Sequence, residues 1–100
     1  MADIIGQHIE ITPGVVGGKA RIAGHRVRAM DIAIWYERQG MSPDQIVDLF
    51  PELTLADIHA ALAYYFDNRE QIDNDIRRDA EIEAEMKAFF AGRQFGRANA

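Results

Sequence analysis

Cysteine is absent from this 100-residue chain, and so are long hydrophobic runs. Without cysteine there is no disulfide scaffold, thiolate metal site or cysteine nucleophile. The longest unbroken apolar run, Ala60 to Phe66, has seven residues, whereas a membrane span needs about 20. The N-terminus also lacks the basic and apolar regions of a signal peptide, so we expect a cytoplasmic protein with no membrane partner.

Positive charge is scarce, with 11 Lys and Arg against 16 Asp and Glu and a formal net charge of -5. This balance excludes a protein that coats nucleic acid by bulk charge. One segment departs from it, because residues 19–28 contain Lys19, Arg21, Arg26 and Arg28 and no acid. We predict that these four cations bind DNA phosphates, the alternative being a solvated hairpin tip.

Candidate catalytic and metal-binding residues are few. The single serine, Ser42, precedes a proline in a helix-start motif, which explains it without a nucleophilic role. The three histidines, His8, His25 and His59, contain no pair spaced for a zinc site, and the carboxylates at 67–85 fall on a solvated helix face. We therefore expect no catalytic residue, no metal site and no cofactor, and the protein is not expected to be an enzyme.

The N-terminal third predicts a small β-element. Residues 8–12 alternate polar and apolar, which indicates a short strand, and Gly24-His25 suits a tight turn. We predict a β-hairpin over residues 8–28. From Met30 the apolar residues follow a helical period, and Gly40 is placed to end that helix.

Two further helices are predicted by their start signals. Ser42-Pro43 with Gln45, and Thr54 with Asp57, read as N-caps with a capping box or an acidic first turn, and Pro51 separates the two helices. Three short helices with short connections outline a helix-turn-helix, although a plain trihelical bundle has the same outline. The core is predicted to contain Trp35, Ile46, Leu49, Ile58 and Leu62.

The C-terminal third predicts a long polar helix with thin apolar stripes. Ile72, Ile76 and Ala80 form one stripe, and Ile82, Met86, Phe89 and Phe90 form a second, displaced around the helix. We expect residues 1–80 to form a single domain and residues 81–100 to be a partner-binding helix end, with a tail from Gly92.

Four motifs resemble one small prokaryotic family. They are Pro13 to Val27 (PGVVGGKARIAGHRV), Gly40-Met41-Ser42-Pro43, Phe50 to Thr54 (FPELT) and Ala61 to Asp67 (ALAYYFD). The sequence is similar to domain of unknown function 433, which is grouped with VapB-type antitoxins. The resemblance implies a mainly α fold, in which a short N-terminal β-element precedes a homeodomain-like trihelical helix-turn-helix core. It also implies a neighbouring PIN-like toxin, a metal-dependent ribonuclease. Ala20 and Arg28 stand where the family often has proline, and His25 where it often has threonine.

This resemblance gives a functional hypothesis, an antitoxin that binds its own operator DNA and neutralises a PIN-like ribonuclease. The third helix is chemically poor for reading DNA, because it has no Lys or Arg before Arg69 and has Asp57 in its first turn. DNA would therefore be bound mostly by the four cations of residues 19–28, and a homodimer would double them.

The ribonuclease would be bound by the second apolar stripe, Ile82, Met86, Phe89 and Phe90. Arg93 or Arg97, just beyond it, would reach the carboxylates of the toxin's metal site. Two alternatives remain open for the chain as a whole, a stand-alone DNA-binding regulator and a dimeric interaction protein with no DNA role. The C-terminal helix could also pack on its own domain or on a dimer mate.

Overall fold

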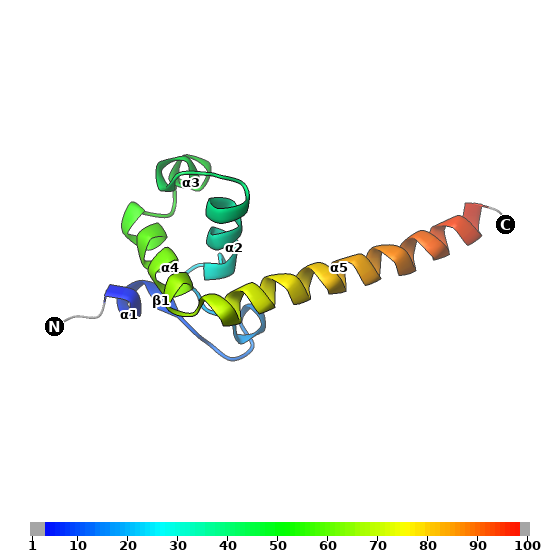
Figure 1. Cartoon of the computed structure of the whole chain (residues 1–100), viewed down its shortest axis with the longest axis horizontal. Helices are drawn as coiled ribbons and strands as arrows, with labels where there is room; N and C mark the ends of the chain where they lie inside the picture. Colours follow the sequence, from blue (N-terminus) through cyan, green and yellow to red (C-terminus); the bar gives the residue numbers. More distant parts are fainter. Residues whose placement is uncertain (1–3, 99–100) are drawn as a thin grey trace.

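Helices make up most of the computed structural model, which describes the backbone of residues 4–98 and the side chains of residues 6–92 (Figure 1). The mainly α fold with a short N-terminal β-element is therefore confirmed. The elements in chain order are α1 (Ile4–His8), β1 (Ile9–Glu10), the 3-10 turn η1 (Val16–Gly18), β2 (Arg21–Ile22), α2 (Ala29–Ala33), the π-helical turn η2 (Ile34–Arg38), α3 (Pro43–Leu49), α4 (Leu55–Asp67) and α5 (Arg69–Ala98).

The β-element is smaller than predicted. β1 pairs antiparallel with β2, with Ile9 opposite Ile22. The prediction of a strand over 8–12 was wrong in extent, because the chain is still helical in α1 up to His8 and the ladder ends at Glu10. Two short strands joined by a long loop leave most of the backbone in this region outside any sheet.

The turn predicted at Gly24-His25 is present, and it is centred one residue earlier. The His25 amide donates to the Ile22 carbonyl at 2.9 Å, which places Ala23 and Gly24 at the centre of the turn. Gly24 has a φ of 78°, a conformation that glycine adopts without steric cost. The Ile22 amide then donates to the Val27 carbonyl at 2.8 Å and closes the small hairpin.

The helix that begins near Met30 widens before it ends. In η2 the Gln39 amide donates to the Ile34 carbonyl at 3.1 Å, a π-type bond. Gly40, with a φ of 68°, terminates it as predicted. The sequence offers no signal for the π turn, which depends on how this helix packs.

Both helix-start predictions are confirmed by reciprocal capping boxes. Gln45 N donates to Ser42 Oγ at 3.2 Å, and Ser42 N donates to the Gln45 side chain at 2.8 Å. Thr54 and Asp57 make the same exchange at 3.1 and 3.0 Å. The helix-turn-helix pair α3 and α4 is thereby defined by its own sequence, with residues 50–54 as the connection.

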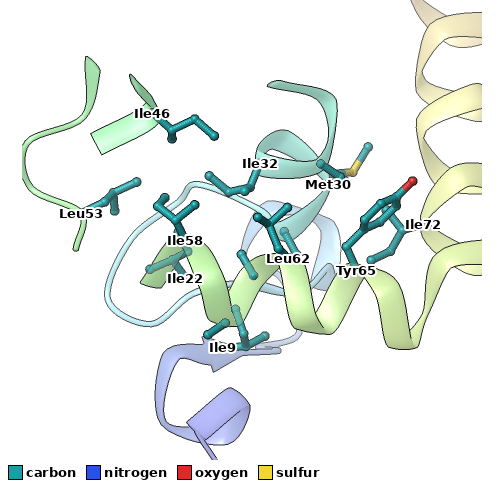
Figure 2. Packing of buried hydrophobic residues seen from close by; sticks show 14 of the residues in the cluster. Ile9, Ile22, Met30, Ile32, Ile46, Leu53, Ile58, Leu62, Tyr65 and Ile72 are labelled. Carbon is teal, nitrogen blue, oxygen red and sulfur yellow. The ribbon is translucent and has the colours of Figure 1, made fainter. Parts of the chain in front are cut away.

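The core lies between α2, α3, α4 and the β-element (Figure 2). Ile46, Ile58 and Leu62 are buried as predicted, while Trp35 is partly buried and stacks on Phe50 with ring centroids 4.7 Å apart. The prediction for Leu49 was wrong, since this side chain is 62% exposed. Val47 and Phe50 share the inner face of α3 with Ile46, which turns Leu49 outward. The fully buried side chains are Ile22, Ile32, Ile46, Leu53 and Ile58.

The helix α5 begins on the globule and then leaves it (Figure 1). Ile72 and Ile76 are buried against the globule, whereas every described side chain from Ala80 to Gly92 is exposed. The radius of gyration is 16.6 Å, against about 13 Å for a compact domain of this length. Within the described part of the chain, none of the helices has the length and apolarity that crossing a membrane requires.

The predicted tail from Gly92 was wrong as a description of the backbone. α5 runs through residue 80 and past Gly92 to Ala98 without a break. Glycine weakens a helix but does not terminate it unless the chain turns there, and no proline follows.

Candidate functional site

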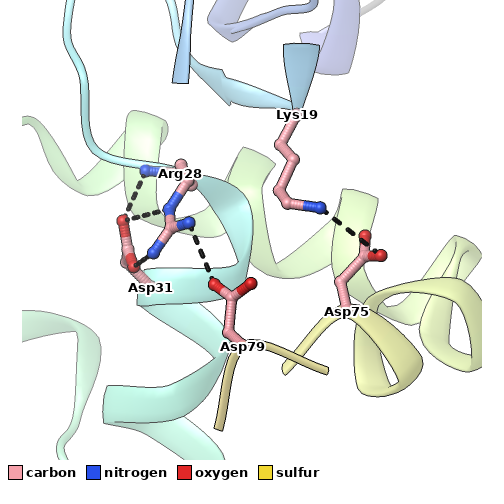
Figure 3. Close-up of polar contacts among 5 residues, drawn as sticks. All are labelled: Lys19, Arg28, Asp31, Asp75 and Asp79. Carbon is pink, nitrogen blue, oxygen red and sulfur yellow. Dashed lines mark hydrogen bonds and ion pairs between the residues drawn. The ribbon is translucent and has the colours of Figure 1, made fainter. Parts of the chain in front are cut away.

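Arg28, predicted to bind DNA, lies at the N-cap of α2 and is held by two carboxylates (Figure 3). Its Nε and Nη2 donate to the two oxygens of Asp31 at 3.2 and 2.9 Å, and its Nη1 donates to Asp79 of α5 at 3.2 Å. The hydrogen bond to Asp31 raises the pKa of Arg28 above its usual value against the opposing effect of partial burial, and Asp79 adds to the increase. Arg28 thus joins the start of α2 to α5.

Lys19, the second predicted cation, lies 3.5 Å from Asp75, one turn before Asp79 on α5 (Figure 3). Both residues line a hollow of about 310 Å³ beneath η1, which Tyr64 and Gln71 also line. About 30% of each side chain is exposed. This ion pair therefore lies where water and small ions have access.

Arg21 is enclosed by the β-element, with only 12% of its side chain exposed. Its guanidinium lies 2.9 Å from Glu10 and donates to Thr12 Oγ1 at 3.2 Å and to the His25 carbonyl at 2.9 Å. It connects β1, the loop and the turn, and its Nε is buried with no hydrogen-bond partner. In this arrangement Arg21 stabilises the hairpin from within.

Arg26 is the exposed member of the predicted set. It follows the Gly24 turn, and the ion pairs found among the described residues do not include it. The structure brings all four cations to the N-terminal element, where Arg21 and Arg28 face each other in a β-bridge.

Four carboxylates meet these cations, and the sequence analysis did not identify them. They are Glu10, Asp31, Asp75 and Asp79. Asp75 and Asp79 are four residues apart, on the side of α5 that also carries the buried Ile72 and Ile76. That spacing was the available signal, because acids flanking a buried stripe lie at the edge of a packed surface.

The exposed face of α4 offers little to DNA. Asp57 lies 2.8 Å from His8 Nδ1 and accepts the Thr54 amide at 3.0 Å. Burial acts to raise the pKa of Asp57, but these hydrogen bonds from Thr54 and His8 outweigh it and leave the pKa lowered. Asp57 therefore caps α4 and anchors α1, and α4 carries no Lys or Arg.

The four apolar residues predicted to bind a partner lie together on the projecting part of α5. Ile82, Met86, Phe89 and Phe90 are between 49% and 56% exposed, and we call them the distal stripe. The rings of Phe89 and Phe90 meet edge to face at 5.6 Å. The side chains of Arg93 and Arg97 lie outside the described residues, and the backbone at both positions is helical.

Among the described residues, no three His, Asp or Glu side chains come close enough together to hold a metal ion. The candidate site therefore comprises two features, a β-element whose cations are largely paired and a helix with an exposed apolar stripe.

Comparison with known proteins identifies the globule. Residues 9–65 match the family described as "Protein of unknown function (DUF433)". A crystal structure of a DUF433 member protein from Anabaena variabilis is 39% identical, with a TM-score of 0.65, and the match covers 74% of this chain and 72% of that chain. No curated protein matches. The family match contains the β-element and the helix-turn-helix up to residue 65, near the end of α4, and does not reach α5. On both the sequence and the structural match, the chain belongs to the DUF433 family.

Proposed function

We propose that this protein is an antitoxin of a type II toxin-antitoxin system. Its distal stripe binds and neutralises a PIN-like ribonuclease, and its N-terminal element binds operator DNA as part of a homodimer. The observation that carries the proposal is the distal stripe, four large apolar side chains about half exposed on a helix that projects from the globule.

The stripe has the chemistry of a helix that fits a partner's groove. The four side chains are already about half buried, so covering the exposed half of two Phe, one Ile and one Met is worth about 3–6 kcal/mol before ordering costs. Glu81, Glu83 and Glu85 flank it, and they suit a partner with a basic rim, as an RNA-cutting enzyme has. Beyond it, Arg93 and Arg97 carry the charge that would pair with the carboxylates of a metal site.

The test uses the full chain and two matched double variants. Met86→Glu with Phe89→Glu places two charges in the stripe, while Ala84→Glu with Ala91→Glu places two on the opposite, exposed face of the same helix. Each is co-expressed with the proposed partner, a PIN-like ribonuclease sought in the neighbouring reading frame. We expect the stripe variant to lose co-purification and inhibition of RNA cleavage and the control to keep both. Equal binding by the two variants would show that the stripe is not the binding surface.

Homodimerisation is supported by the β-element. Within the described chain β1 pairs with β2 alone, and the proposed dimer would pair a second copy with its other edge. Sedimentation of the free protein at tens of micromolar should show a dimer. A monomer under these conditions would remove the dimer from the proposal.

Operator binding is supported by the exposed Arg26, which lies in the chain's most basic segment. A dimer would present two copies of Arg26. It would also present two copies of Lys19 and of Arg28, if DNA phosphates replace the carboxylates that pair with them. DNA from upstream of the gene, in a gel-shift titration at several salt concentrations, tests this part separately from toxin binding.

A second function, a dimeric interaction protein with no DNA role, is favoured by one observation. Three of the four cations already have carboxylate partners within the chain. Toxin binding without operator binding would support this function, and sequence-selective operator binding would exclude it.

A further inference from the structure

Among the described side chains, three ion pairs join α5 to the N-terminal half of the chain, and two of them involve the cations of residues 19–28 (Figure 3). Lys19 meets Asp75 at 3.5 Å, and Arg28 meets Asp79 at 3.2 Å. The two carboxylates come from adjacent turns of one helix, and the cations come from a segment about fifty residues earlier. The same two cations are among those proposed to bind DNA.

We propose that Asp75 and Asp79 occupy the positions of DNA phosphates on Lys19 and Arg28, so that α5 acts as an intramolecular competitor of operator DNA. The inference rests on the proposed operator binding and adds its regulation. A carboxylate and a phosphate use the same charge-assisted hydrogen bonds to ammonium and guanidinium groups, so one can replace the other.

The geometry allows this exchange at Arg28 without loss of the helix cap. Nε and Nη2 of Arg28 bind Asp31, the capping-box residue of α2, while Nη1 serves Asp79 alone. Displacing Asp79 would therefore free one donor and leave the bidentate contact with Asp31 intact. Asp79 is 41% exposed and, among the described side chains of α5, is the last with an ion pair to the globule, so solvent and DNA have access to it.

Lys19 and Asp75 have a similar exposure and meet over an open hollow. The ammonium can turn from Asp75 to a phosphate by rotating its side chain, since it makes a single contact there. Arg21 differs, because three groups of the β-element enclose it. The competition therefore concerns Lys19 and Arg28 and leaves Arg21 in place.

The competition is reciprocal by linkage. DNA that takes Lys19 and Arg28 removes two polar contacts of α5. The buried Ile72 and Ile76 and the Tyr65–Asp73 hydrogen bond still hold the helix on the globule. A ligand that stabilises the packing of α5 on the globule therefore weakens DNA binding. DNA weakens the binding of that ligand by the same factor.

The test compares two full-chain double variants that remove the same charge from the same helix at the same spacing. Asp75→Asn with Asp79→Asn releases the two cations, and Glu81→Gln with Glu85→Gln changes two exposed carboxylates beyond the globule. We expect the first to bind operator DNA about tenfold more tightly, with a salt slope steeper by about two units per protomer, and the second to stay near wild type. Adding Lys19→Ala to the first should remove about one unit of that slope.

The outcomes separate this inference from the function on which it rests. If the wild type binds the operator and the Asp75, Asp79 variant shows the same affinity and slope, the competition is absent and operator binding stands. An equal increase in DNA affinity in both double variants would mean that the change in net charge alone explains it, and would overturn the inference. If no form binds operator DNA, the operator part of the proposed function fails, and the inference fails with it.

Discussion

The two halves of α5 have similar sequences and opposite surroundings. Residues 69–80 and residues 81–92 both place apolar side chains every three or four positions among charges. In the first half Ile72 and Ile76 are 5% and 6% exposed, and Asp75 and Asp79 pair with cations of the N-terminal element. In the second half the distal stripe is about half exposed. An apolar stripe on a helix therefore predicts a surface that packs against it. The stripe alone does not indicate whether that surface belongs to the same chain or to a partner.

The difference arises from what each half can reach. α2 and α4 lie beside the first turns of α5, so these turns complete the core of their own domain. A straight helix of 30 residues extends about 45 Å, which carries its second half beyond the globule. A surface placed there is available to another molecule, which is what an inhibitory helix requires.

The largest expected effect contrasts one isoleucine from each half. Ile76→Ala should lower the free energy of unfolding by about 2–4 kcal/mol, because it leaves a cavity between α5 and the globule. Ile82→Ala should change it by less than about 0.5 kcal/mol, since Ile82 is exposed in the free protein. Urea denaturation of both variants measures the free energy of unfolding. Equal decreases would mean that both halves of α5 pack equally on the globule in the free protein.

A second prediction uses the contact between α4 and the first half of α5. Tyr65 donates to Asp73 at 2.7 Å, and burial, with help from this hydrogen bond, raises its pKa to about 12. A raised folded-state pKa stabilises the protein below the unfolded value of about 10 and loses that contribution as pH rises to 12. Wild-type stability should therefore fall by about 2 kcal/mol more than that of Tyr65→Phe between pH 10 and 12. If the free energy of unfolding of both proteins changed equally with pH, the raised pKa of Tyr65 and its contact with Asp73 would be contradicted.

The smallest expected effect concerns the exposed Arg26. Arg26→Ala should weaken operator binding by about 1 kcal/mol and lower the salt slope by about one unit per protomer, with no change in thermal stability. Gln39→Ala, an exposed and uncharged position, is the matched control. Unchanged affinity and slope in the Arg26 variant would move any DNA contact away from this turn.

Local signals predicted much of the fold. The caps at Ser42 and Thr54 and the helix end at Gly40 each depend on neighbours within a few residues, and all three were found. Leu49 was misplaced because α3 is only seven residues long and its inner face is set by the packing of Val47 and Phe50. The π turn η2 and the extent of α1 depend on tertiary packing in the same way.

In the candidate site, too, features that depend on nearby residues were predicted and features that depend on distant residues were not. The exposure of the distal stripe was predicted, since a core that closes near Phe66 leaves no room for it. The ion pairs of Lys19 and Arg28 were not predicted, because their partners Asp75 and Asp79 are more than fifty residues away in the sequence. Local charge counts such as the +4 of residues 19–28 omit neutralisation of this kind.

The most direct test of the account is amide hydrogen exchange along α5, measured with and without the PIN-like ribonuclease that we propose as its partner. In the free protein, residues 72–79 should be protected to nearly the level of the core and residues 82–90 should exchange quickly, because only the first segment packs on the globule. Addition of the ribonuclease should slow exchange in residues 82–90 by at least tenfold, our threshold for burial in a partner, and leave α3 and α4 unchanged. Protection that appears in α3 and α4 instead, or nowhere, would contradict the claim that the projecting half of α5 is the partner-binding surface.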